Sequence, residues 1–102
     1  MPFEPYSPEP AIVSAELALA RKVRDLLAVP ERWCKVKFRI DPGSCMVGAI
    51  MRFGSIKRPE SVAVRKRMEL ICGNRVESFN DHPATTHADI VRVTAALVAS
   101  FE

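Results

Sequence analysis

The sequence has few of the features that mark a metalloprotein, a nucleotide-binding enzyme or a membrane protein. Only three of its 102 residues are cysteine and two are histidine, and no pair has the C-x-x-C or H-x-x-x-C spacing of a zinc site. It has no glycine-rich loop to cradle a phosphate and no paired-carboxylate motif. No apolar run reaches about 18 residues, the length that a membrane span requires. We therefore expect no metal, no cofactor and no membrane contact.

The first ten residues and the odd number of cysteines bear on the compartment. Residues 1–10 contain four prolines and are acidic, whereas a signal peptide begins basic and apolar. An odd number of cysteines with no close spacing fits reduced thiols. These features predict a cytoplasmic protein with an extended proline-rich segment at 1–10 and a single helical domain at 11–102.

Hydrophobic periodicity predicts a mostly α fold with a minor β element. Apolar residues recur at three and four positions in stretches beginning near Ala11 and at Pro59 and Thr86. Capping residues and prolines limit the predicted helices to 11–29, 45–53, 59–72 and 86–101. We predict one small domain in which the other three helices surround the helix at 45–53.

The stretch from Cys45 to Phe53 is the reason for placing that helix at the centre. It holds one charge, Arg52, and is otherwise apolar or glycine. A helix that is apolar on every side has to be enclosed on every side. Ser44 is a plausible N-cap and Gly54 a plausible C-terminal stop. We expect the helix at 45–53 to be the most buried element.

The segment 35–40 alternates between basic and apolar side chains, which predicts a strand. Its pairing partner is either residues 75–79, which the sequence otherwise indicates to be a short bridge, or another chain. The basic side chains along one face are typical of a protected sheet edge.

Residues 80–87 form a second unusual stretch, rich in turn and cap formers. Thr86 and Asp89 have the spacing of a capping box at the start of the last helix. The apolar stripe of that helix is predicted to include Ile90 and Val91, which places His87 on its core-facing side.

The order of three motifs resembles a family of small bacterial and phage proteins with no assigned function. The motifs are P-E-x-W, matched by residues 30–33, C-x-x-G-A at 45–49, and W-N-D-x-P-x-x-T at 79–86. Phe79 stands where the last motif has tryptophan. The resemblance covers about residues 11–100 and implies a cytoplasmic, mostly helical domain, without implying an activity.

Cys45 is the thiol with the strongest chemical case, because a helix start favours a thiolate. A nucleophilic cysteine also needs an imidazole and a group that orients it, roles open to His87 and to Asn80 or Asp81. The alternative is that Cys45 is a small buried hydrophobe and that Asn80 and Asp81 bond free backbone amides. We favour the structural interpretation.

The charge is unevenly distributed, since residues 21–67 hold thirteen of the fifteen Lys and Arg residues. Ordinary helix surface explains this, but a nucleic-acid interface is an alternative. Its contacts would come from eight basic side chains: Lys35, Lys37, Arg39, Lys57, Arg58, Arg65, Lys66 and Arg67.

Three functions are therefore open. The first is a non-enzymatic small accessory protein that binds a protein partner, with an origin in phage or mobile DNA implied by the resemblance. The second is a nucleic-acid-binding protein that uses the basic residues between 35 and 67. The third is a cysteine-dependent hydrolase or transferase centred on Cys45 and His87. We favour the first, with the partner unidentified and homo-oligomerisation left open.

Overall fold

A computed structural model of the chain describes residues 14–35, 39–40 and 43–102. The elements, in chain order, are α1 (Ala15–Leu27), the 3-10 helix η1 (Pro30–Arg32), β1 (Arg39–Ile40), β2 (Gly43–Ser44), α2 (Met46–Met51), α3 (Pro59–Cys72), α4 (Val76–Asp81) and α5 (His87–Phe101). The mostly α class is confirmed, with one more helix than the sequence predicts. The expected extended segment at 1–10 lies outside the described residues.

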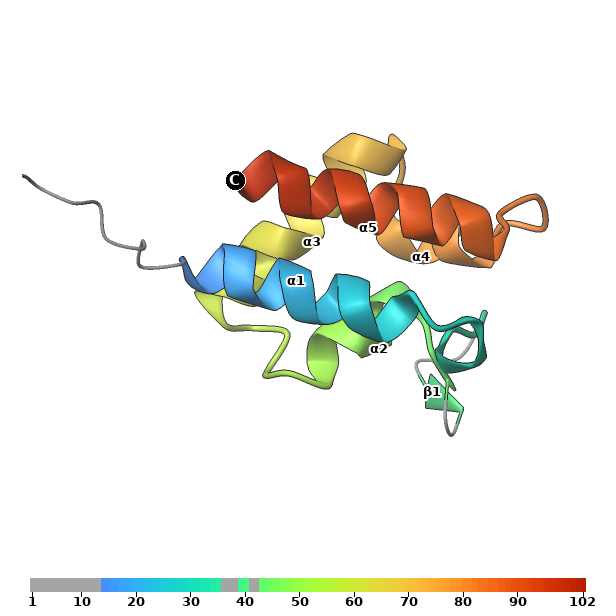
Figure 1. The fold of residues 1–102 in the computed structure, drawn as a ribbon, viewed down its shortest axis with the longest axis horizontal. Helices are drawn as coiled ribbons and strands as arrows, with labels where there is room; N and C mark the ends of the chain where they lie inside the picture. The colour runs from blue at the N-terminus through green and yellow to red at the C-terminus, as the bar shows by residue number, and fades with distance from the viewer. Residues whose placement is uncertain (1–13, 36–38, 41–42) are drawn as a thin grey trace, which may run out of the picture.

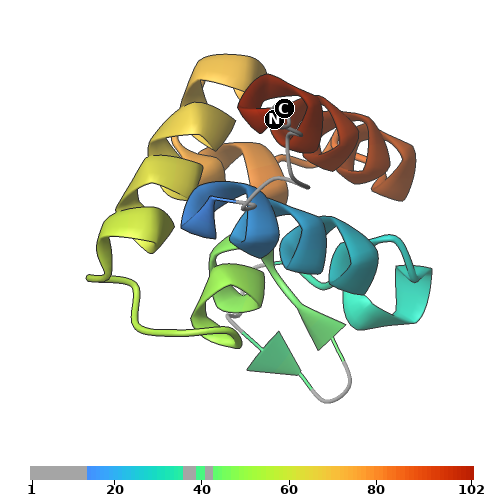
Figure 2. The same ribbon diagram turned by 60° about the vertical axis from the view of Figure 1, so that its left-hand side comes forward.

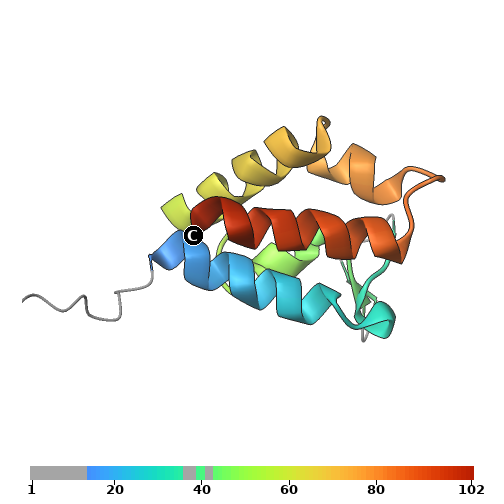
Figure 3. The ribbon, with the colours of Figure 1, turned by 45° about the horizontal axis from the view of Figure 1, so that its top comes forward.

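The two longest apolar stripes belong to α1 and α5, which lie side by side and run in opposite directions (Figures 1 and 3). Ser14 caps α1 by accepting a 3.1 Å hydrogen bond from the amide of Leu17. The helix ends at Leu27 rather than Val29, and Pro30 begins η1. Because the helices are antiparallel, Arg21 in α1 lies 3.7 Å from the Glu102 carboxylate beyond the end of α5.

The capping box of α5 is confirmed: Thr86 and Asp89 exchange side-chain to backbone hydrogen bonds in both directions. Ile90 is buried as expected. The prediction for Val91 is wrong, because it is exposed and Val93 is buried in its place. A spacing of three from Ile90, rather than one, keeps an α-helical side chain on the same face.

The predicted bridge at residues 75–79 is also wrong, because α4 occupies Val76–Asp81. Helix α3 ends at Cys72, as the sequence predicts, because Gly73 adopts the left-handed conformation with φ 71°. Helix α4 follows after this glycine. In Figure 3, α3 and α4 follow one another along one side of α5. Val76 and Asn80, one helical turn apart, are the buried residues of α4.

Helix α2 is enclosed, as its apolar sequence predicts. All residues from Met46 to Ile50 are buried, and the helix contacts α1, α3 and α4. Burying a methionine or isoleucine side chain contributes about 1.5–3 kcal/mol. The predicted bounds are too wide, since α2 ends at Met51 and both Met51 and Phe53 are exposed. The N-cap is Cys45 and not Ser44.

Ser44 does not cap α2 because it belongs to strand β2 of a small sheet, which lies below α1 and α2 in Figure 2. Strand β1 pairs with β2 as an antiparallel hairpin, and residues 76–79 lie in α4, so the suggested pairing with residues 75–79 is wrong. Pairing of this segment with another chain stays a prediction. Residues 36–38 of that predicted strand lie outside the described residues. Ser44 also forms a parallel bridge with Trp33 and accepts a 2.7 Å hydrogen bond from Arg52 Nε on its hydroxyl.

In the described part of the chain, none of the helices combines the length and the apolar character needed to cross a membrane.

Candidate functional site

The side chain of Asn80 lies where three separate segments of the chain meet. Its Oδ1 accepts a 2.8 Å hydrogen bond from Trp33 Nε1 and a 3.1 Å bond from the backbone amide of Met46. Its Nδ2 donates 3.1 Å to the carbonyl of Cys34 and 2.9 Å to Asp81 Oδ1. We call these five residues the Asn80 cluster.

Asn80 is 1% exposed, so its amide has little access to water. A side-chain amide has two donor hydrogens and two acceptor lone pairs, and here all four are used. A fully bonded buried amide is stable, whereas each partner left unsatisfied would cost about 1–3 kcal/mol. This geometry fixes the chain before α2 against α4, which is a structural role.

Cys45 lies next to this cluster and is buried. Its Sγ accepts a 3.3 Å hydrogen bond from the amide of Gly48, so the thiol caps α2. Burial raises the pKa of Cys45 above its ordinary value of 9.0, and negative charge on the nearby Cys34 and Asp81 raises it further. The bonds from the Val47 and Gly48 amides oppose this shift and are too weak to reverse it. The thiol is therefore protonated at neutral pH.

His87 is directed to a different neighbour. Its Nε2 lies 2.7 Å from the carbonyl oxygen of Leu27, and its ring lies 6.0 Å from that of Trp33, tilted by 43°. The bond to a carbonyl acceptor requires that Nε2 carry the proton. Within the described residues, Cys45 and His87 make no hydrogen bond to each other. The structure thus places Asn80 beside Cys45 but does not assemble a cysteine–histidine pair.

The loop between α4 and α5 is held by its own polar groups and by Lys35. Thr85 Oγ1 donates 2.7 Å to the carbonyl of Phe79, and His82 Nδ1 accepts 3.0 Å from the amide of Ala84. Lys35 Nζ donates 2.9 Å to the His82 carbonyl and lies 5.7 Å from the centre of the Trp33 ring. This loop is therefore ordered by local caps and by contacts to residues 33–35.

Four of the eight proposed nucleic-acid contacts already have partners, and Lys35 is one of them. Arg65 forms a two-pronged pair with Glu77 at 2.8 and 2.6 Å, and Arg58 pairs with Glu60 at 2.8 Å. Arg67 donates a 2.7 Å hydrogen bond to the Ser100 carbonyl. Lys37 and the side chain of Arg39 are not among the described parts of the chain. Lys57 and Lys66 are exposed. The basic residues therefore do not act as one unpaired row.

No three His, Cys, Asp or Glu side chains of the described ranges are grouped so that they could hold a metal ion.

An exposed leucine is the surface feature that the sequence predictions miss. Leu70 in α3 is 78% exposed, and it lines an open groove of about 470 Å³ together with Lys66, Glu69, Asn74 and Arg75. The inward-facing stripe of α3 is Val64, Met68 and Ile71, so Leu70 falls outside it. That mismatch between an apolar residue and the helical period was visible in the sequence.

The chain belongs to DUF6197, a family of unknown function, which it matches over residues 14–99. The match covers α1 to α4 and most of α5, and it includes every residue of the Asn80 cluster. Comparison with curated proteins gives no match, and comparison with solved structures gives none either.

Proposed function

We propose that the protein is a non-enzymatic accessory protein that binds a protein partner through the groove at Leu70. The observation that carries the proposal is the 78% exposure of Leu70, whereas the inward-facing Val64 and Met68 of α3 are buried. An isolated exposed leucine is common, but here it lies within a groove that also has charged walls. A partner that covers Leu70 would remove this apolar surface from water.

The charges around the groove favour an acidic partner. Glu69 is already engaged, because its Oε2 accepts 3.1 Å from the Val76 amide and lies 3.7 Å from Arg65 Nε. Lys66 forms no ion pair with a described residue, whereas the charge of Arg75 acts on the Glu77 carboxylate and helps to lower its pKa. Positive charge beside an apolar anchor fits a partner segment that carries an apolar side chain next to Asp or Glu.

The state of the proposed catalytic residues supports a non-enzymatic function. A nucleophilic cysteine needs a thiolate and a base within hydrogen-bond reach. The Cys45 thiol is buried with a raised pKa, and the His87 ring bonds Leu27. A nucleic-acid interface is not proposed as a second function, because Arg58, Arg65 and Arg67 are already engaged.

Site-specific photo-crosslinking tests the proposal. A photoreactive phenylalanine analogue is placed at Leu70 in the full chain, and at Val91, which is 41% exposed on α5, as the control. In cells of the source organism we expect position 70 to cross-link to one protein that position 91 does not capture. The purified partner should then bind at least about tenfold more weakly to Leu70→Lys, the typical effect of losing an interface anchor.

Val91→Lys should leave that affinity unchanged. Equal loss in both variants would contradict the proposal, as would a cross-link from position 70 only to a second copy of the chain. The origin in phage or mobile DNA, which the sequence resemblance implies, is tested separately by the genes that adjoin this one.

A further inference from the structure

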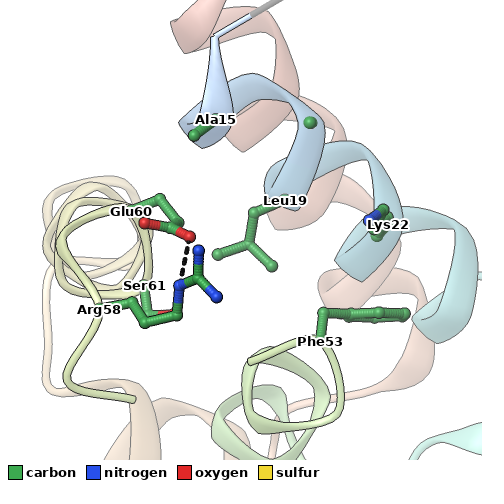
Figure 4. A pocket seen from close by; sticks show the side chains of 8 residues that line it. Ala15, Leu19, Lys22, Phe53, Arg58, Glu60 and Ser61 are labelled. Carbon is green, nitrogen blue, oxygen red and sulfur yellow. Dashed lines mark ion pairs between the residues drawn. The ribbon is translucent and has the colours of Figure 1, made fainter. Parts of the chain in front are cut away.

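A second hollow lies on another part of the molecule, between α1 and the start of α3 (Figure 4). Its volume is about 280 Å³, close to the lower limit of about 300 Å³ for small-molecule sites. The apolar wall consists of Ala15, Ala18, Leu19 and Phe53. The polar lining consists of Lys22, Arg58, Glu60 and Ser61.

Ser61 provides the first indication of a ligand. The residue is 1% exposed and lines the hollow, yet its hydroxyl makes no hydrogen bond within the part of the chain that is described. Buried polar groups in folded proteins almost always have a partner, because an unpaired one is destabilising. A hydroxyl that is buried, unpaired and faces a hollow is suited to a ligand that accepts a hydrogen bond.

The start of α3 supplies the second indication, and it concerns charge. The helix has 14 residues, its N-cap Arg58 makes no side-chain cap bond, and Pro59 occupies the first turn. The amides of Glu60 and Ser61 are consequently left without a capping side chain, at the positive end of the helix dipole. An acceptor bound next to Ser61 would satisfy these donors as well as the hydroxyl.

The lining charges define the class of ligand. Lys22 and Arg58 are cationic and Glu60 is anionic, which leaves one net positive charge. The Glu60 carboxylate holds the Arg58 guanidinium at 2.8 Å, and Lys22 Nζ lies 5.9 Å from the centre of the Phe53 ring (Figure 4). One net charge beside an apolar wall suits a monoanion with an apolar body better than it suits a phosphate dianion.

We propose that this hollow binds a small organic carboxylate with an apolar or aromatic body. The carboxylate accepts hydrogen bonds from Ser61 and the first-turn amides of α3, and its body packs against Leu19 and Phe53. This site is separate from the Leu70 groove and is independent of the function proposed for that groove.

Titration of the full chain followed by amide NMR tests the proposal. The probes are benzoate, hexanoate, the uncharged benzamide and inorganic phosphate. We expect saturable shifts at the amides of Glu60 and Ser61 with both carboxylates, and none with benzamide or phosphate at equal concentration. Ser61→Ala should weaken the affinity for benzoate by about tenfold or more, since a hydrogen bond to a charged group is lost.

Ser61→Ala is not expected to unfold the protein, because it removes a hydroxyl that has no partner. Lys22→Gln should also weaken the affinity for benzoate, because it removes a positive charge from the lining of the hollow. Lys57→Gln is the matched control, since this exposed lysine is adjacent in sequence to Arg58 but does not line the hollow. The proposal is overturned if no carboxylate gives saturable shifts at these amides, or if benzamide or phosphate binds as tightly as benzoate. It is also overturned if Ser61→Ala binds benzoate with the affinity of the parent chain, or if Lys57→Gln weakens binding as much as Lys22→Gln.

Discussion

The indole Nε1 of Trp33 donates a 2.8 Å hydrogen bond to Oδ1 of Asn80, a residue 47 positions further along the chain. The same oxygen accepts the Met46 amide, so one buried atom joins the segment after η1, the start of α2 and α4. Residues from all three sequence motifs thus meet at one side chain, since Trp33, Met46 and Asn80 each belong to a different motif. The three motifs therefore share a structural role, which is to hold these segments together.

Substituting Asn80 should be more destabilising than removing an ordinary helix cap. Asn80→Ala would leave the Trp33 indole N–H and the Met46 amide without acceptors in a buried place, which costs about 2–4 kcal/mol. Thr86→Ala, which removes an exposed cap, should cost only about 1 kcal/mol. Urea unfolding of both variants measures the difference.

Asn80→Asp sharpens this comparison, because it keeps an oxygen for Trp33 and Met46 but replaces the donor Nδ2 with a second acceptor. That acceptor would face the Cys34 carbonyl and the Asp81 carboxylate. We expect Asn80→Asp to be destabilised as well at neutral pH. Stability equal to the parent chain in either Asn80 variant would contradict the structural role.

The sequence predicts those elements whose signals are local. Thr86 caps its helix as expected, because a cap depends on residues three positions away. Helix α4 is missed because it has six residues and its N-cap Arg75 makes no side-chain cap bond. The apolar residues Val76 and Phe79, three positions apart, were a weak sign of it.

The Asn80 cluster could not be predicted from spacing, since its members are 34 to 47 positions from Asn80, except for the adjacent Asp81. The packing of α4 against α2 brings Asn80 to Met46, and the bridge to Ser44 brings Trp33 and Cys34 to the same place. The N-cap of α2 was also not predictable from residue type alone. Ser44 is the better capping residue by type, but the hairpin and Arg52 engage it, so the cap moves to the next residue.

The end of α3 gives a prediction about backbone conformation. Gly73 has φ 71°, and a Cβ placed there would have nothing within 4 Å, so a substitution is penalised by conformation and not by a clash. Gly73→Ala should therefore cost about 1 kcal/mol of unfolding free energy. Gly73→Asn should cost less, because asparagine adopts this conformation more readily. Equal stability of all three proteins in urea would contradict this interpretation.

The pair between Arg65 and Glu77 predicts a pH dependence. Partial burial alone would raise the pKa of Glu77, but its own backbone amide and the Arg65 guanidinium hold it below the ordinary 4.5. A lowered pKa stabilises the fold above about pH 4.5, and that contribution is lost as the pH falls through the folded-state pKa. The parent chain should therefore exceed Glu77→Gln in stability at pH 7, and the difference should shrink towards pH 3, where most carboxylates are protonated.

Urea unfolding of both proteins across this pH range provides the measurement. In an Arg65→Gln background the same comparison should show a smaller pH dependence, because one of the groups that lower the pKa is gone. A stability difference that grows as the pH falls would have the wrong sign for this pair.

The central claim is that Cys45 and His87 support the fold and are not a catalytic pair, and the native thiol reactivity of Cys45 tests it most directly. The full chain is labelled with a maleimide at pH 7, and each cysteine is quantified by peptide mass spectrometry. Because burial raises the pKa of Cys45 above 9.0, fewer than about one thiol in a hundred is ionised at that pH. We predict that Cys45 labels no faster than the protein opens, and that His87→Ala does not slow it. Rapid, selective labelling of native Cys45 that falls in His87→Ala would contradict the account.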